Sequence, residues 1–578
     1  MSTNIGLSWS LSIFIIFFFL FVTYIWDRFF SLRGLPKNLP WAGASSSAVS
    51  RAEAVRRSWF GLRDLIQNGY YEHSKHEHVF VLPNLATGPE VILPPSQLKW
   101  LLEQPDHVLN QRKVNNEFLH AERTMLHPNI PRDTVHGHVI RRELTKHIDN
   151  FVEAMAEESL YALSINWGVN TRDWTEMSGY KMMLDIVSRT SNRVLVGFPL
   201  CRNEDYLRCS STFSRNVVLS ASALNLLPSF LQSLFAPIIT AYDTYQYRKI
   251  ARHTTPIIKN RMAAFKPGLD YRNPDYSKHN DYIQWALHDA FSHDDLEERT
   301  AGMITKRLSV LSFALIQSSV ITITNAIFDI ACSPSSAEIQ KSLREEIQRV
   351  MADNPGKEWE KGSLAKMVRL DSTLRESMRL WGFISRGVMK KVVAPEGITL
   401  PSGDFLPKGT NVGVTSYAVQ HDESVYHRAF SFDPFRFSRP LEDPSVKNAR
   451  PLPMVTTTDD FMAFSHGRHA CPGRFFASTQ LKILLAQIIL NYDIAPLAKR
   501  PENLWFNNTM APPMWDSLQV RRRPGTVTES VLPPPIRTRT ASTAASFIPE
   551  EARRMLDVKV LQGCAASTGL AGPIVMNS

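Results

Sequence analysis

The chain has 578 residues, with 65 Lys and Arg against 55 Asp and Glu, which gives a formal net charge of +10. The basic residues do not form long blocks, so the charge argues against nucleic-acid binding and fits an anionic membrane surface or an acidic protein partner better. Five cysteines, an odd number without CxxC spacing, argue against both a disulfide framework and a zinc site. We therefore expect the bulk of the chain to fold in a reducing compartment.

The N-terminal segment from Ile5 to Trp26 is almost wholly apolar and uncharged, and it is long enough to cross a bilayer as a helix. A cleaved signal peptide would have basic residues before its apolar core, and none precedes Ile5. The alternative is a signal sequence cut near residues 42–44. We predict a transmembrane anchor over residues 1–27.

Cations follow this apolar segment, namely Arg28, Arg33 and Lys37. The positive-inside rule then places the remainder of the chain in the cytosol, with a single membrane pass. Pro36 and Pro40 stiffen the connection. Residues 28–42 are predicted to form a basic, proline-containing hinge.

Two short runs after the hinge, Val79–Leu82 and Glu90–Leu93, predict strands of a small sheet. The stretch Ser220–Leu234 is apolar and interrupted by Pro228, which is typical of a buried helix pair or of a surface that dips into lipid. The polar segment Pro267–Asp281 predicts a loop. The periodicity around these features is mainly helical.

The segment Leu308–Cys332 is apolar enough to suggest a second membrane span. Several polar residues interrupt it, which favours a buried helix that crosses a globular domain. These residues are Gln317, Ser318, Ser319, Thr322, Thr324, Asn325 and Asp329.

Glu376 and Arg379 are three residues apart, so on a helix they share a face and can form an ion pair. Pairs of this kind are common on exposed helices and contribute little there. Alone, this spacing favours an ordinary surface pair.

The stretch Phe464–Arg474, with the sequence FSHGRHACPGR, sets Cys471 in a loop bounded by Gly467 and Gly473 and followed by an apolar helix over residues 475–492. A thiolate that ligates a heme iron needs a rigid loop whose backbone amides can hydrogen-bond its sulfur. Glycines permit the turn and the close approach of backbone to a macrocycle. The alternative is a buried free cysteine beside a turn.

This loop resembles the proximal loop of the cytochrome P450 family, Phe-x-x-Gly-x-x-x-Cys-x-Gly, and every fixed position matches. Residues 432–437, with the sequence FDPFRF, match the second signature of that family. The resemblance covers roughly Leu35 to Arg523. It implies a mainly α fold with small β-sheets, in one heme-thiolate monooxygenase domain over residues 43–523.

The resemblance implies heme b as cofactor, with Cys471 as the axial iron ligand. It also implies that Glu376, Arg379 and Arg436 form a buried charge network with a structural role. The residues expected to hold the heme and its propionates are Phe464, Gly467, Arg468, His469, Cys471, Gly473, His138, Arg142 and Lys390, with Arg386 as an alternative to Lys390.

The central helix departs from the family pattern Ala/Gly-Gly-x-Asp/Glu-Thr-Thr, because the matching residues are Ala314–Ser319. The glycine and the acid are missing, and Ser318 replaces the threonine that helps deliver protons. We expect Ser318, Gln317 and Ser319 to form the proton relay. The alternative is that these polar residues only satisfy a buried helix.

The resemblance implies a monooxygenase of the endoplasmic reticulum membrane that oxidises a lipophilic small molecule with O2, in fungal secondary metabolism of the terpenoid, polyketide or alkaloid type. Electrons would come from NADPH through cytochrome P450 reductase, with cytochrome b5 as a further partner. The alternatives are an isomerase or dehydratase that uses no dioxygen, and a heme-binding sensor. The segments expected to face the substrate are Asn110–Met125, Ser220–Leu234, Ala314–Ser319, Phe383–Val388 and Thr509–Pro513.

Residues 524–578 are rich in Pro, Ser, Thr, Ala and Gly. This composition cannot bury much apolar surface and predicts a disordered tail.

Overall fold

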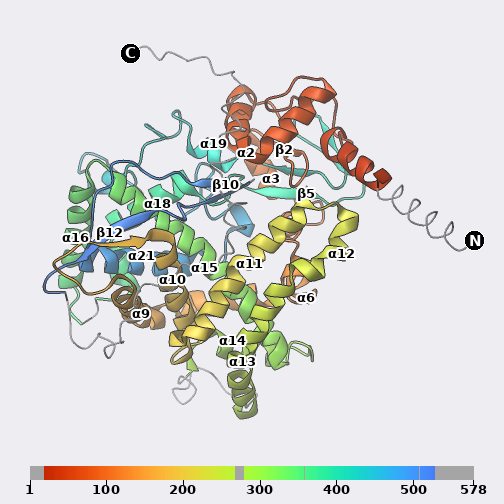
Figure 1. The fold of residues 1–578 in the computed structure, drawn as a ribbon. Coiled ribbons are helices and arrows are strands. Elements are labelled where there is room, and N and C mark those ends of the chain that lie inside the picture. Colours follow the sequence, from red (N-terminus) through yellow and green to blue (C-terminus); the bar gives the residue numbers. More distant parts are fainter. Residues whose placement is uncertain (1–17, 267–278, 357, 507, 527–578) are drawn as a thin grey trace, which may run out of the picture. The chain divides into compact units, whose positions relative to one another are not determined.

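The computed structural model describes residues 18–266, 279–356, 358–506 and 508–526. The chain divides into one unit over Met1–Val531 and a second over Leu532–Ser578, and the second lies outside the described residues. The predicted loop Pro267–Asp281 and the predicted tail 524–578 also fall mostly outside them. The described unit is mainly helical with small sheets, as predicted (Figure 1).

The helix α15 (Ala301–Cys332) forms the core of this unit. It packs against α10 (Gly179–Leu195), α11 (Glu204–Leu226), α13 (Ala241–Ala264) and α18 (Val368–Trp381). Among the described residues it is the helix long and apolar enough to cross a membrane, but 67% of its most apolar window is buried inside the protein. It is therefore the buried helix expected from its interrupted apolar pattern.

Further helices surround this core. They are α2 (Ala48–Glu72), α3 (Leu98–Glu103), α4 (Gln111–Phe118), α5 (Ala121–Thr124), α6 (Asn129–Arg132), α7 (Val135–Val139), α8 (Thr145–His147), α9 (Asp149–Trp167), α12 (Ser229–Ile239), α14 (Tyr282–Ser292), α16 (Ser336–Ala352), α17 (Lys361–Lys366), α19 (Ser416–Gln420), α20 (Arg439–Glu442) and α21 (Arg474–Asn491). The observed α21 matches the helix predicted after the cysteine loop.

The largest sheet has the strand order β1-β2-β8-β5-β3. Its first two strands, β1 (Phe80–Leu82) and β2 (Glu90–Ile92), pair antiparallel and confirm the two predicted strands. The remaining strands of this sheet are β3 (Leu109–Asn110), β5 (Met389–Val392) and β8 (Asn411–Gly413). The smaller sheets are β4 (Thr175–Ser178) with β12 (Ser517–Arg522) and β9 (Tyr492–Ile494), β6 (Ile398–Thr399) with β7 (Phe405–Leu406), and β10 (Leu504–Phe506) with β11 (Thr509–Ala511).

The N-terminal helix is described from residue 18 and continues to residue 29, so Arg28 lies within it; the first part of the predicted anchor, residues 1–17, lies outside the described residues. The Arg28 guanidinium donates to the Ala86 carbonyl (2.7 Å) and to the Asn225 carbonyl (3.2 Å). These bonds fix the helix against the end of α11. Its exposed large apolar side chains are Phe18, Phe19, Leu20, Phe21, Val22 and Trp26.

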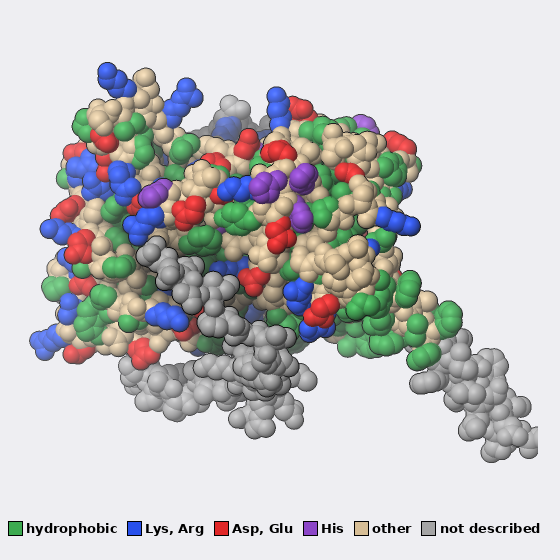
Figure 2. Space-filling model, turned by 90° about the horizontal axis from the view of Figure 1, so that it is seen from above, with side chains coloured by type: hydrophobic (Ala, Val, Ile, Leu, Met, Phe, Trp, Pro, Cys, Tyr) green, Lys and Arg blue, Asp and Glu red, His purple; other side chains and the backbone are tan. Residues whose placement is uncertain are grey.

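The segment Ser220–Leu234, predicted to be a buried helix pair or a surface that dips into lipid, changes its surroundings at Pro228. On its N-terminal side α11 packs into the core, whereas α12, on the other side, exposes large apolar side chains, namely Phe230, Leu234, Phe235 and Ile238. On the face shown in Figure 2, basic and acidic side chains are interspersed, and hydrophobic ones gather beside the N-terminal helix at the right edge. On this face the charge is therefore spread, and a hydrophobic group of side chains lies at the right edge.

Candidate active site

The loop that carries Cys471 is fixed by its own backbone. The Cys471 N–H donates to the Phe464 carbonyl at 2.9 Å, directly before α21 begins. Gly467 has φ +73°, and a Cβ there would lie 2.8 Å from Leu102 Cδ2. Both the left-handed conformation and the close packing require glycine at this position.

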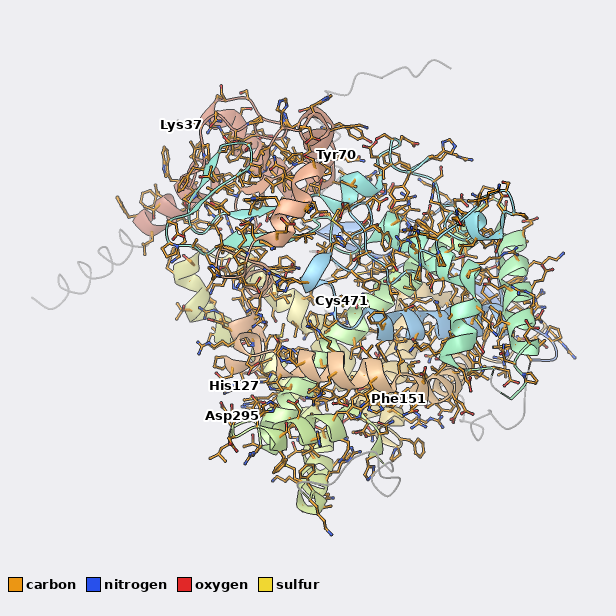
Figure 3. All side chains as sticks on the ribbon, turned by 180° about the vertical axis from the view of Figure 1, so that it is seen from behind. Lys37, Tyr70, His127, Phe151, Asp295 and Cys471 are labelled. Atoms are coloured by element: carbon orange, nitrogen blue, oxygen red, sulfur yellow. The ribbon has the colours of Figure 1, made fainter. Side chains whose placement is uncertain are left out.

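Cys471 lies just before the N-terminal end of α21, and Figure 3 shows its label near the centre of the picture. Burial raises the pKa of the Cys471 thiol, while hydrogen bonds from the backbone amides of Gly473 and Arg474 and the Arg474 guanidinium act to lower that pKa. Amide donors of this kind stabilise negative charge on sulfur. The loop thus supplies the environment that a metal-bound thiolate needs.

A strip of α15 is accessible although most of this helix is buried. Ala314 is exposed, and the residues that share its face are partly exposed: Phe313, Gln317, Ser318, Ile321 and Thr322. Positions three and four apart lie on one face of a helix, so these side chains form a continuous strip. Ser319 is only 2% exposed and lies on another face.

Two of the three predicted relay residues therefore belong to this strip. The Ser318 hydroxyl donates to the Ala314 carbonyl at 3.1 Å, within the helix. The Gln317 Oε1 accepts a hydrogen bond from the Tyr180 hydroxyl of α10 at 3.3 Å, while its Nε2 has no hydrogen-bond partner. The Tyr180 hydroxyl therefore occupies the Oε1 end of the Gln317 amide, and the Nε2 end is left without an acceptor.

Three of the predicted propionate-binding cations gather beside the cysteine loop. Lys390 and Arg468 both donate to the Gln104 carbonyl, at 3.2 and 2.6 Å. Arg468 also pairs with Asp106, and His469 Nε2 lies 2.8 Å from the same carboxylate. Burial, with a smaller effect from Arg468, lowers the pKa of Lys390 to about 8.

The other predicted cations do not join this cluster. Arg142 pairs with Glu143 at 2.6 Å and with Asp289 at 3.1 Å. Arg386 forms a buried ion pair with Glu90. His138 is exposed at the end of α7.

Glu376, Arg379 and Arg436 form one buried network. Glu376 and Arg379 are both 0% exposed, and two parallel hydrogen bonds of 2.8 Å join them. The Arg436 Nε lies 3.1 Å from both carboxylate oxygens, and the Asp433 amide donates to one of them at 3.2 Å. One carboxylate therefore binds α18 to the chain segment that precedes the cysteine loop.

This network reaches the cysteine loop through Gln420. The Arg379 guanidinium donates to the Gln420 carbonyl, and the Gln420 amide donates to the Arg379 carbonyl at 2.7 Å. The Gln420 Oε1 accepts the Met462 N–H at 3.1 Å, two residues before Phe464, which in turn holds Cys471. Hydrogen bonds therefore lead from Glu376 to the chain that holds the sulfur.

Arg375 adds a second connection. Its guanidinium donates to the carbonyls of Pro453 (2.9 Å) and Thr456 (2.7 Å) and lies over the Phe461 ring at 3.7 Å. Sequence reasoning did not single out Arg375, Gln420, Asp106 or Tyr180. Each acts through partners distant in the chain, and no local pattern distinguishes it.

Comparison with known proteins identifies the family. The model for "Cytochrome P450" matches residues 73–514. Cytochrome P450 monooxygenase 151 of Postia placenta is 32% identical over 84% of this chain and 94% of its own length. The gloP monooxygenase of Glarea lozoyensis is 31% identical over 84% of this chain and 90% of its own, and pbrC of Penicillium brasilianum is 28% identical over 87% and 95%.

The chain belongs to the cytochrome P450 family and is a cytochrome P450 monooxygenase. This family implies a heme, and the residues present fit one. Gly467 and the amide donors to Cys471 suit a thiolate ligand, and the Gln317 Nε2 is a buried, unpartnered donor on a side chain of the α15 strip. Lys390 and Arg468 are cations that could face the anionic rim of the macrocycle, and His469 lies beside Arg468 on the same carboxylate.

We predict that Cys471→Ala abolishes the red-shifted Soret band of the reduced, carbon-monoxide-bound protein, because among the four described cysteines Cys471 is the one in the glycine-bounded loop with amide donors at its sulfur. The matched control is Cys332→Ala at the end of α15, which should keep the band. Absorption spectra of the purified variants measure this. A retained band in Cys471→Ala would contradict the assignment of Cys471 as the iron ligand.

We predict that Glu376→Gln lowers the free energy of unfolding by about 3–5 kcal/mol, since it leaves two arginines without their buried counter-charge. Heme content should fall with it. The control Glu53→Gln breaks the exposed pair with Arg56 and should change stability little. Urea denaturation followed by tryptophan fluorescence measures both, and equal stabilities would contradict the role of the network.

Proposed function

We propose that this enzyme oxidises a lipophilic small molecule in fungal secondary metabolism, using O2 and electrons from NADPH through cytochrome P450 reductase, with cytochrome b5 as a further electron donor. The observation that carries the proposal is the accessible strip of α15. It presents three apolar side chains, Phe313, Ala314 and Ile321, beside three polar ones, Gln317, Ser318 and Thr322. Small-molecule sites combine apolar surface, which binds a lipophilic substrate, with a few placed polar groups, which orient it.

Each group of residues has a role in this proposal. Bound at Cys471, heme supplies the activation of dioxygen and the transfer of one oxygen atom. The cluster of Lys390, Arg468 and His469 neutralises the propionates. Ser318 holds a proton at Oγ beside the apolar strip, and Gln317 orients that hydroxyl or a water through its free Nε2.

The proposed location is the endoplasmic reticulum membrane, with a single pass and a cytosolic catalytic domain. Two apolar surfaces support it, the N-terminal helix and α12. The Tyr24 hydroxyl donates to the Leu226 carbonyl at 3.3 Å, and Arg28 bonds the adjacent residue, so that helix is joined to α11 just before α12. Clusters of exposed apolar side chains on neighbouring helices are typical of contact with a membrane or a partner.

The test is to compare metabolites of a deletion strain with those of its parent and to supply the accumulating compound to the purified enzyme. With reductase, NADPH and isotopically labelled O2, the product should carry one labelled oxygen atom. Conversion without NADPH and without label would instead support a dioxygen-independent isomerase or dehydratase.

We predict that Ser318→Ala reduces product formation about a hundredfold, because one hydrogen-bond donor at the reacting oxygen is lost. More NADPH should then be spent on peroxide, while heme content stays unchanged. Ser319→Ala is the matched control, since Ser319 is buried on another face of α15. The ratio of product to NADPH consumed measures both variants; an unchanged ratio in Ser318→Ala would exclude Ser318 from the relay.

A further inference from the structure

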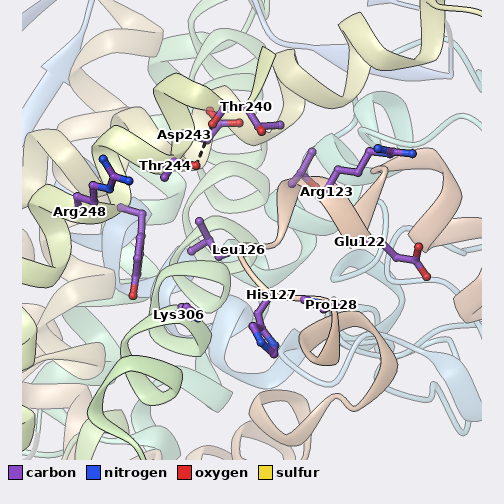
Figure 4. A pocket seen from close by; sticks show the side chains of 12 residues that line it. Glu122, Arg123, Leu126, His127, Pro128, Thr240, Asp243, Thr244, Arg248 and Lys306 are labelled. Carbon is purple, nitrogen blue, oxygen red and sulfur yellow. Dashed lines mark hydrogen bonds between the residues drawn. The ribbon is translucent and has the colours of Figure 1, made fainter. Parts of the chain in front are cut away.

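One pocket of the structure has no residue of the cysteine loop in its lining. Its volume is about 380 Å³, and it is formed by the segment 122–128, by α13 and by Lys306 of α15 (Figure 4). Lys306 precedes Ala314 by eight residues, or about 12 Å along the helix at 1.5 Å per residue. The pocket volume is in the range that holds small molecules.

The buried acid of this pocket is Asp243, which is 2% exposed; the other acid of the lining, Glu122, is exposed. No donor lies within ordinary hydrogen-bond geometry of either Asp243 carboxylate oxygen. The Ser220 hydroxyl is the donor nearby: it lies 3.5 Å from the Ile239 carbonyl, and its hydrogen bonding to Asp243 acts to lower the pKa of that carboxyl, whereas burial raises the pKa to about 6. A buried carboxylate served by one hydroxyl at most is costly, so a bound molecule with further donors would stabilise it.

The basic side of the pocket is separate from this acid. Arg123, Arg248 and Lys306 all line the pocket, yet none of them contributes to the pKa of Asp243. In Figure 4, Arg123 and Arg248 lie on either side of Asp243 and are exposed at the rim. The pocket therefore presents a buried negative group, Asp243, and a rim in contact with solvent on which three positive groups outnumber one acid, Glu122.

We propose that this pocket binds a small dipolar molecule, with a protonated amine hydrogen-bonded to Asp243 and an anionic group at Arg248 and its neighbouring cations. The amine of such a molecule would donate hydrogen bonds to Asp243, and its anionic group would pair with the cations at the rim. The site is distinct from the oxidation centre. It takes a ligand chemically unlike the apolar substrate proposed for the α15 strip.

The test is calorimetric titration of the full-length, heme-loaded protein in detergent with 6-aminohexanoate. Binding should be saturable with a dissociation constant at or below about 1 mM. Hexanoate, which lacks the amine, and 6-aminohexanamide, which lacks the anion, should each bind at least about tenfold more weakly. Equal binding of either compound, or a red shift of the Soret band that reports amine ligation of the iron, would overturn the proposal.

Asp243→Asn should weaken binding of 6-aminohexanoate about 10- to 100-fold, because a charge-assisted hydrogen bond becomes a neutral one. Arg248→Ala should weaken it about tenfold, whereas Lys249→Ala, the adjacent cation that does not line the pocket, should not. Arg248 is exposed, so this pair of variants keeps the test valid if Asp243→Asn does not fold. Unchanged binding in Arg248→Ala or in folded Asp243→Asn would contradict the site. None of these measurements requires turnover, so they stand apart from the proposed oxidation.

Discussion

The position of the Cys471 sulfur depends on one carboxylate that water does not reach. Glu376 pairs with both Arg379 and Arg436, and the guanidinium of Arg379 donates to the backbone carbonyls of Gln420 and Ala429. A buried charge is tolerated only when it is paired and fully hydrogen-bonded, so these partners define each other's positions. The Gln420 side chain then accepts a hydrogen bond from the Met462 amide, so the network also positions the chain just before the cysteine loop.

The two sides of the active site differ in how they are built. The cysteine side is fixed by backbone hydrogen bonds and a left-handed glycine, which suits a ligand that must not move. The α15 strip combines three apolar side chains with the Gln317 amide and with the hydroxyls of Ser318 and Thr322, each of which donates to a carbonyl of its own helix. We infer that the rigid side serves any substrate alike and that the α15 strip determines which substrate is accepted.

Much of the fold followed from local patterns in the sequence. The glycine spacing located the cysteine loop and the start of α21, two short runs typical of strands located β1 and β2, and the interrupted apolar pattern distinguished α15 from a membrane span. Contacts between distant segments were not predictable in this way. Asp106 meets Arg468 and His469 more than 360 residues further on, and no local signal distinguishes it from other surface acids. Arg142 was expected at the heme rim, but Glu143 beside it and Asp289 on α14 bind it instead. Asp243 is exceptional because its buried carboxylate has so few hydrogen-bond donors, and no sequence pattern predicts that.

The central claim is that this chain binds heme through the Cys471 thiolate on a loop fixed by buried charge. Iron-edge X-ray absorption of the purified, heme-loaded protein measures this most directly, because it identifies the atoms bound to the iron. The account predicts one sulfur in the first coordination shell of the wild type, replaced by nitrogen or oxygen in Cys471→Ser. A wild-type spectrum without sulfur, or a Cys471→Ser spectrum that retains it, would contradict the account.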